Sequence, residues 1–232
     1  IGRIHNRGHC GSCWAFGALQ ALDSRMCIAD PDFTGSSADL SRGFAASCIK
    51  EALYGSDQAD GCAGGLPIDV FKYVETEGGL PLTSCVAYFA EGAGSEHFQK
   101  NGVAPPCPTA CDDAAQDLQK SKQRPMHVGN GVKQYKPDEK YMKQVLSSGG
   151  PVPYALNAQM LSYYDSGIFN YACWGNANHA VTAIGYTSEY IVTANSWGED
   201  WGEKGYFRTP FCSVQWFTPP GPISAGSKFS LE

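Results

Sequence analysis

Cys10-Gly11-Ser12-Cys13-Trp14 begins an apolar-periodic run that extends to about Ile28. Apolar residues recur through this run at helical spacing, which predicts one amphipathic helix over residues 13–29. Cys13 then lies in the first turn of the helix, where backbone N–H groups and the positive end of the helix dipole stabilise an anion. Because the thiolate is the reactive form of cysteine, this stretch predicts that Cys13 is a nucleophile.

The composition allows one large domain or two lobes around a real core, since the 232 residues are 43% apolar and 17% charged. No stretch approaches the roughly 18 apolar residues of a membrane helix. We therefore expect no membrane span, and we expect any targeting segment or pro-segment to lie outside residues 1–232. The net charge of −6, with no Lys/Arg-rich run, argues against a nucleic-acid partner.

The chain has ten cysteines, far more than a reduced cytosolic protein usually holds. This number predicts a disulfide framework. It also predicts a lysosome-like or vacuolar compartment, or secretion.

The two halves of the chain differ in their patterns, which suggests an α+β fold of two lobes. In the first half, helical patterns follow the 13–29 run at residues 37–48 and 66–77. In the second half, one more helix is predicted at residues 137–148. Strands are predicted at residues 128–135, 152–156, 167–171, 179–186, 190–195 and 205–208.

Two polar residues of the second half supply what a thiol nucleophile needs, which is a base and a group that orients the base. His179 stands just before a β-type run, and Asn195 opens the stretch Asn195-Ser196-Trp197. Each of them alone is an ordinary structural residue. They are nevertheless candidates for the base and for the group that orients it.

Two other uses of the cysteines are open at this point. Cys10 and Cys13 have the spacing of a redox pair, although no short βαβ pattern surrounds them and Trp14 follows. The same two cysteines and the pair Cys107/Cys111 have a spacing that suits a zinc site.

The opening stretch is typical of papain and cathepsin nucleophiles. From residue 2 to about 217 the chain resembles the papain-like cysteine peptidases, and within them the cathepsin B type. The resemblance implies a papain-like fold with a helical left lobe, a β-barrel-like right lobe and the active-site cleft between them. It implies that Cys13 is the nucleophile, that His179 is the acid/base, and that Asn195 holds the imidazole under Trp197. It implies no metal and no organic cofactor.

On this resemblance we expect three segments: a mainly helical left lobe at residues 1–112, a β-rich right lobe at 113–222, and a flexible tail at 223–232. The family pattern also implies four disulfides, which are Cys10–Cys62, Cys48–Cys107, Cys85–Cys111 and Cys173–Cys212. Cys13 stays free, and Cys27 is left without a partner within this chain.

The chain departs from the family pattern at Arg7. The family has a Gln six residues before the nucleophile, and this Gln and the backbone N–H of the nucleophile, here Cys13, form the oxyanion hole. Losing one such donor typically costs about 10²–10³ in rate. Arg7 is still a donor, but it is longer and permanently charged.

A second departure lies in the segment that resembles the occluding loop of cathepsin B, Ser95-Glu96-His97-Phe98-Gln99-Lys100-Asn101-Gly102. Only one of two adjacent family histidines remains, as His97, and Phe98 stands at the carboxylate-binding place. We therefore expect weak or no dipeptidyl carboxypeptidase action.

The resemblance also implies the substrate-binding residues. Gly64 and Gly65 present backbone groups to an extended peptide. Leu66, Pro67 and Ala180 line an apolar S2 pocket, Trp197 borders the site, and the far end of S2 falls near Phe217.

The expected function is that of a cysteine endopeptidase with a thioester intermediate on Cys13 and an apolar P2 preference. The alternative is a catalytically impaired cathepsin B-like relative with a binding or structural role in a larger assembly. The expected partners are a peptide or protein substrate, the protein's own pro-segment and possible assembly partners.

Overall fold

The computed structural model describes residues 2–50, 60–90, 103–123, 131–221 and 223. Its helices, 3-10 turns (η) and strands are α1 (Cys13–Ala29), η1 (Gly35–Ala38), α2 (Arg42–Cys48), η2 (Gly61–Ala63), α4 (Pro67–Glu77), β1 (Leu80–Pro81), α5 (Leu118–Ser121), β2 (Lys122–Gln123), α6 (Glu139–Gly149), β3 (Val152–Leu156), η4 (Leu161–Tyr163), η5 (Asn170–Cys173), β4 (His179–Tyr186), β5 (Ile191–Ala194), β6 (Tyr206–Thr209), η6 (Phe211–Ser213) and β7 (Trp216–Phe217).

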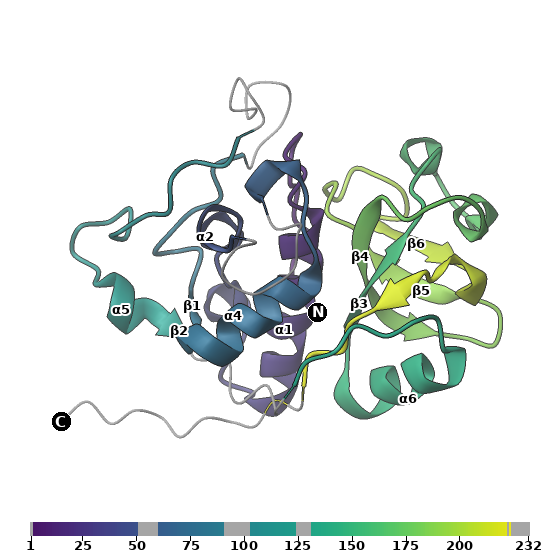
Figure 1. The fold of residues 1–232 in the computed structure, drawn as a ribbon, viewed down its shortest axis with the longest axis horizontal. Coiled ribbons are helices and arrows are strands. Elements are labelled where there is room, and N and C mark those ends of the chain that lie inside the picture. Colours follow the sequence, from purple (N-terminus) through teal and green to yellow (C-terminus); the bar gives the residue numbers. More distant parts are fainter. Residues whose placement is uncertain (1, 51–59, 91–102, 124–130, 222, 224–232) are drawn as a thin grey trace.

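The molecule has a helical side and a β-rich side, each with its own hydrophobic core (Figure 1). The helical core is built mainly from α1, α2 and α4. The other core lies on an antiparallel sheet of five strands in the order β6-β5-β4-β3-β7. The expected α+β fold is confirmed.

Helix α1 lies between the two sides and touches both (Figure 1). The hydroxyl of Thr182 on β4 donates to the Gly17 carbonyl at 2.9 Å. A Cβ atom at Gly17 would lie 3.5 Å from the backbone of Val181, which is ordinary van der Waals contact, so α1 and β4 pack closely at this point. Every residue from Trp14 to Met26 is buried. The prediction of an amphipathic helix is therefore wrong in one respect, because β4 covers the face that the pattern leaves for solvent.

The strongest strand predictions are confirmed. β3 and β4 have the predicted bounds, and β5 and β6 differ by a residue at their ends. The predicted strand at 167–171 is wrong: Phe169 N–H donates to the Arg208 carbonyl at 2.8 Å, and the chain then turns into η5. The predicted strand at 128–135 falls partly outside the described residues, and residues 131–135 form only a bridge between Tyr135 and Phe217.

The segment after Cys111 belongs with the helical side. Leu118 and Val132 pack in the helical core, and β2 pairs with β1. The predicted boundary between residues 112 and 113 is therefore too early in the chain. Ile223 also packs on the helical core, whereas residues 224–232 and the predicted occluding-loop segment 95–102 lie outside the described residues.

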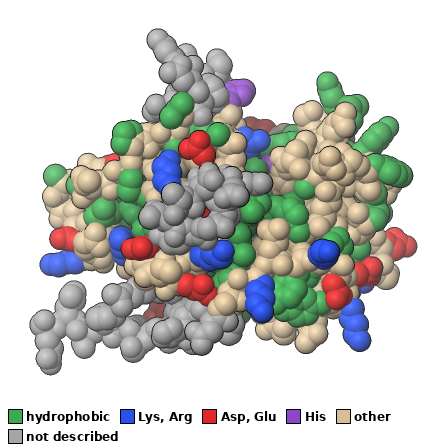
Figure 2. Space-filling view, viewed as in Figure 1, with side chains coloured by type: hydrophobic (Ala, Val, Ile, Leu, Met, Phe, Trp, Pro, Cys, Tyr) green, Lys and Arg blue, Asp and Glu red, His purple; other side chains and the backbone are tan. Residues whose placement is uncertain are grey.

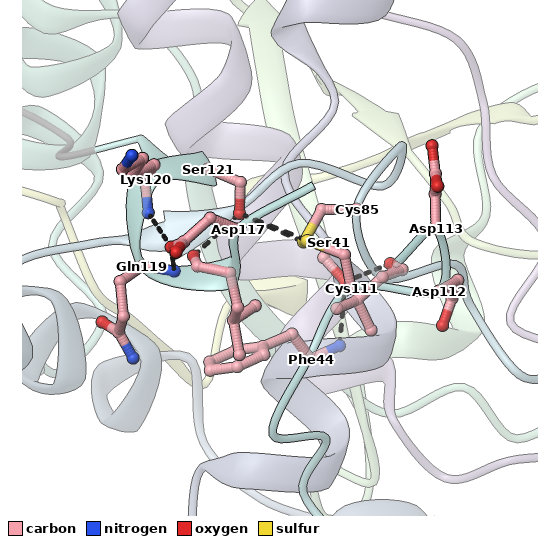
Figure 3. Close-up of a disulfide and its surroundings, with 12 residues drawn as sticks. Ser41, Phe44, Cys85, Cys111, Asp112, Asp113, Asp117, Gln119, Lys120 and Ser121 are labelled. Atoms are coloured by element: carbon pink, nitrogen blue, oxygen red, sulfur yellow. Dashed lines mark hydrogen bonds between the residues drawn. A yellow bond between two sulfur atoms is a disulfide. The ribbon is translucent and has the colours of Figure 1, made fainter. Parts of the chain in front are cut away.

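Four disulfides join the pairs that the family resemblance implies. Cys173–Cys212 is on the β-rich side, and the other three are on the helical side. Figure 3 shows Cys85–Cys111, where the Ser121 hydroxyl of α5 donates to the Cys85 sulfur at 3.1 Å. This bridge and its hydrogen bond hold α5 beside the helical core, which is why the boundary lies later than predicted.

No described helix is long and apolar enough to cross a membrane. On the face drawn in Figure 2, Lys and Arg side chains are interspersed with Asp and Glu side chains.

Candidate active site

Cys13 is the first residue of α1, and its thiol is free and partly exposed. The loop before it is held in place at three points. Cys10 is bonded to Cys62, and Gly11 N–H donates to the Cys62 carbonyl at 2.9 Å. The third point is Tyr88, which shares a 2.8 Å hydrogen bond with the Ser12 hydroxyl. The thiol therefore sits on a rigid loop at the positive end of a long helix, where a thiolate is stabilised.

Tyr88 was not predicted as part of this site. Its hydroxyl also donates to the Arg7 carbonyl at 2.9 Å, so one side chain ties both ends of the loop. Nothing in the sequence distinguishes Tyr88 from other aromatic residues, since the contact joins positions 81 residues apart.

His179 is the first residue of β4, and it is buried against Asn195. The Nε2 atom of His179 lies 2.8 Å from Oδ1 of Asn195. Ser196 N–H donates to the same Oδ1 at 2.9 Å, so this atom of Asn195 is a hydrogen-bond acceptor. This fixes which end of the Asn195 side-chain amide is the oxygen. Because Oδ1 accepts, Nε2 of His179 carries the hydrogen. The lone pair is then on Nδ1, which is the atom left to act as a base.

Two tryptophans cover the His179–Asn195 bond. The Trp197 ring stacks on the His179 ring with centroids 5.0 Å apart and planes 23° apart. Trp201 packs edge-on against Trp197, with centroids 5.0 Å apart. This shields the hydrogen bond from water, which strengthens it. The sequence placed Trp197 here but assigned no role to Trp201.

The packing of α1 along β4 brings the two halves of the site to the same end of the junction. A cavity of about 10 Å³ between α1 and the sheet is lined by Phe16, Gly17, Ala180 and Asn195. Phe16 and Gly17 lie in the turn of α1 that begins with Cys13 and just after it. Ala180 is next to His179 in the chain, and Asn195 is hydrogen-bonded to His179. A cavity of this size holds at most one water molecule. The first turn of α1 is therefore tightly packed against the strands that carry His179 and Asn195.

Arg7 lies between these two parts of the site. Its backbone N–H donates to the Ser196 carbonyl at 2.9 Å. Its Nη1 atom donates to the carbonyls of Cys10 at 2.5 Å and Gly8 at 3.4 Å. Its Nε is buried and has no hydrogen-bond partner among the described residues. No described carboxylate forms an ion pair with Arg7, so its charge acts on the site.

The charge state of His179 reflects its burial and Arg7. Burial and then the positive charge of Arg7 lower the pKa of His179 to about 3, and the hydrogen bond with Asn195 opposes this shift. The imidazole is therefore neutral near pH 7 unless an anion next to it compensates.

The predicted substrate-binding residues lie on both sides of α1. A Cβ atom at Gly65 would clash with the Trp14 ring at 2.5 Å, so glycine is required beside the residue that follows Cys13. Gly64 has φ +127°, and a Cβ atom there would meet nothing within 4 Å. The backbone at Gly64 thus faces open space. Leu66 and Pro67 follow at the start of α4.

Two of the S2 expectations meet buried residues. Ala180 is 5% exposed and lines the small cavity beside α1. Phe217 is fully buried and stacks with Tyr135, with centroids 5.6 Å apart. The Phe217 ring itself packs in the core of the β-rich side, and the expectation that the far end of S2 falls near this position stays a prediction.

The structure argues against the redox and zinc uses of the cysteines. Cys10 is bonded to Cys62 rather than to Cys13, and Cys107 and Cys111 are also in disulfides. The thiols that either use needs are thus consumed. Among the described residues, no group of three or more His, Cys, Asp or Glu side chains has the arrangement of a metal site.

Comparisons with known proteins agree with this geometry. Residues 1–212 match the family described as papain family cysteine protease. A cathepsin B-like cysteine proteinase of Schistosoma japonicum is 35% identical over 228 residues, which cover 90% of this chain and 63% of that protein. Cathepsin B-like CP2 of Giardia intestinalis is 31% identical, over 90% of this chain and 64% of that protein. The chain thus spans less than two thirds of the length of these relatives.

A solved structure is similar over nearly the whole chain. The cysteine protease CMS1MS2 of Carica candamarcensis, in complex with E-64, superposes with a TM-score of 0.72 at 26% identity, over 96% of this chain and 94% of that one. The fold, the free cysteine at the start of α1 and these matches agree, and the chain belongs to the papain family of cysteine proteases.

Proposed function

We propose that this protein is a cysteine endopeptidase in which Cys13 is the nucleophile, His179 the acid/base and Asn195 the residue that orients His179. The hydrogen bond between His179 Nε2 and Asn195 Oδ1 is the observation that carries the proposal. This bond leaves Nδ1 as the basic atom of the buried imidazole. His179 lies on β4, which packs against α1, and α1 begins with the free thiol of Cys13.

The proposed reaction has two steps. The Cys13 thiolate forms a bond to the peptide carbonyl carbon, and the electron pair of the C=O bond moves to oxygen. When the oxyanion collapses, the C–N bond breaks and His179 Nδ1 gives its proton to the leaving amine. Water then attacks the thioester while Nδ1 takes a proton from it, and the acid product and the Cys13 thiol are released.

Arg7 acts on this chemistry in opposite directions. Its positive charge favours an oxyanion but disfavours the imidazolium, as the lowered pKa of His179 indicates. The thiolate–imidazolium pair then exists in a narrower and more acidic pH range than it would beside a neutral residue. We propose that the protein works at acidic pH in a lysosome-like compartment or after secretion, and that its own pro-segment keeps it a zymogen.

Arg7 also decides how complete the oxyanion hole is. We propose that the Cys13 backbone N–H and the Arg7 side chain are its two donors. Nη1 of Arg7 is already bonded to the Cys10 carbonyl, which reduces what the side chain offers to substrate. The same bond supports the second candidate function, a catalytically impaired relative with a binding or structural role in a larger assembly.

The proposed substrate is an extended peptide with an apolar P2 side chain. The open backbone at Gly64 and the following Gly65 support pairing with such a peptide. Leu66, Pro67, Ala180 and Trp197 are apolar, and no acidic residue is proposed for S2. Dipeptidyl carboxypeptidase action is proposed to be weak or absent, because the segment with Phe98 and a single His97 departs from the cathepsin B loop.

A cleavage assay tests this proposal. Peptides with Phe, Leu or Arg at P2 are compared at pH 4 to 7, each with a blocked and a free C-terminus. We expect the Phe and Leu peptides to be cleaved fastest, without a requirement for a free C-terminus. A Cys13→Ser variant controls for contaminating peptidases. Faster cleavage of the Arg peptide would contradict the apolar S2, and no cleavage of any peptide would favour the impaired relative.

A further inference from the structure

A large cavity lies at the end of α1 opposite Cys13. Its volume is about 550 Å³, and it lies between the last turn of α1, the end of α6 and the Pro219–Gly221 segment. Figure 1 shows the end of α1 and helix α6 at the lower side of the molecule, where the chain crosses between the two sides. Pockets for small ligands typically have volumes of about 300–1,000 Å³, so this cavity is large enough for one.

Arg25 is a buried cation in the wall of this cavity. The residue is 5% exposed and lines the cavity. Its three nitrogens donate to backbone carbonyls only: Nε to Pro151 at 2.8 Å, Nη2 to Gly150 at 3.0 Å and Nη1 to Pro220 at 3.4 Å. No described carboxylate pairs with it. A buried charge without a counter-ion is costly, and burial lowers the pKa of Arg25 to about 10.

The rest of the lining has the same sign of charge. Lys133 is the second charged residue, and no Asp or Glu belongs to the described lining. The protein as a whole carries a net charge of −6, so the described lining has the opposite sign of charge to the whole chain. The carboxylate of Glu75 accepts from the N–H of the lining residue Val132 at 3.3 Å, and Glu75 itself is not part of the described lining.

The remaining walls are apolar or aromatic. Ile28, Val132 and Val145 contribute aliphatic side chains, and Tyr135 and Tyr141 contribute rings with centroids 4.9 Å apart. Mostly apolar walls with a few convergent polar groups are typical of small-molecule sites.

We propose that this cavity binds a small organic anion, with its carboxylate or sulfonate facing Arg25 and Lys133 and its apolar body against the aliphatic and tyrosine walls. The bound anion supplies the counter-charge that Arg25 lacks. Cys13 does not line this cavity, so anion binding can be tested separately from the peptidase proposal.

A pair of matched fluorescent probes tests this site on the full chain with Cys13 blocked. Anilinonaphthalene sulfonate has an apolar body and a negative charge, and phenylnaphthylamine is its uncharged counterpart. We expect one sulfonate probe to bind per molecule, about tenfold or more tighter than the neutral probe. Equal affinity of the two probes would overturn the anion preference. Failure of the sulfonate to bind would overturn the site.

Surface variants locate the probe without endangering the fold. Lys133 is exposed and Ile28 is 66% exposed, so Lys133→Glu and Ile28→Glu are expected to keep the structure. Lys133→Glu should weaken sulfonate binding about three- to tenfold and leave phenylnaphthylamine binding unchanged. Ile28→Glu removes part of the apolar wall and should weaken the binding of both probes. Tyr163→Ser and Trp174→Ser are the controls, because these side chains are 80% and 66% exposed, at η4 and just after η5, and neither lines the cavity. A loss of binding in the controls but not in the cavity variants would overturn the assignment.

Discussion

The two ends of helix α1 carry the same two residue types in opposite settings. Each end has a free, half-buried thiol, Cys13 at the start and Cys27 in the last turns. Each end also has an arginine that donates to carbonyl groups, Arg7 before the helix and Arg25 within it. The helix dipole stabilises a thiolate at the start and disfavours one at the end.

The two arginines differ in what their bonds connect. Arg25 reaches residues 125 to 195 positions away, so it holds α1, α6 and the Pro219–Gly221 segment together. Nη1 of Arg7 bonds only within its own loop, and its Nε is unpaired among the described residues. Arg25 thus builds the junction between the two sides, whereas Arg7 sets the electrostatics of the site. The end of α1 thus contributes mainly to stability, whereas the start of α1 belongs to the proposed catalytic site.

The largest effect is expected at the start of the helix. Cys13→Ala should lower kcat/KM by about 10⁴-fold or more, because the nucleophile is removed. Cys27→Ala at the other end should leave kcat/KM unchanged. Peptide hydrolysis by both variants checks this, and comparable losses in the two would break the comparison.

Asn195→Ala should have the next largest effect, a loss of about 10²–10³-fold in kcat/KM, because His179 loses the acceptor that sets its tautomer. Asn178→Ala is the matched control, since Asn178 precedes His179 but accepts from Ala158 N–H instead. Steady-state kinetics separates the two, and an Asn195→Ala enzyme as active as the control would refute the orienting role.

Arg25→Met should reduce the free energy of unfolding by about 2–3 kcal/mol, because three buried carbonyl groups lose their donor. Arg25→Lys should lose less, since it keeps one donor and the charge. Urea denaturation measures both. The activity per folded molecule should stay near that of the unchanged protein. An Arg25→Met variant with the same free energy of unfolding as the unchanged protein would contradict the structural role of Arg25.

Arg7→Gln should have the smallest effect at the optimum and the clearest effect on pH dependence. Arg7 lowers the pKa of His179, so its removal raises that pKa and keeps the imidazolium to higher pH. The alkaline limb of the kcat/KM profile should move to higher pH. Arg7→Lys is the control that keeps the charge, and a profile unchanged in Arg7→Gln would contradict the account.

Parts of the structure that depend on local pattern were predictable. The strand that begins at His179 follows from its β-type run, and the helix that begins at Cys13 follows from its apolar spacing. The disulfides followed from the family resemblance rather than from spacing. What could not be predicted depends on contacts between distant residues. The partner of Tyr88, the burial of Phe217 and the carbonyls around Arg25 are set by tertiary packing.

The position of α5 shows the same limit. A boundary at residue 112 suits the change of composition there, but the Cys85–Cys111 bridge and Leu118 keep the following segment on the helical side. The residues proposed for the site come from the sequence, but its electrostatics could not be predicted, because the effect of Arg7 on His179 depends on how the loop before Cys13 lies against Asn195-Ser196.

Covalent labelling with a peptidyl epoxide tests the central claim most directly, because Cys13 and Cys27 are two free thiols on one helix and serve as each other's control. The protein is treated at acidic pH under mild reducing conditions, and the labelled residue is identified by mass spectrometry. The account predicts rapid labelling of Cys13, little of Cys27, and about 10²-fold slower labelling of Cys13 in His179→Ala. Equal labelling of the two thiols, or a Cys13 that stays unlabelled, would contradict it.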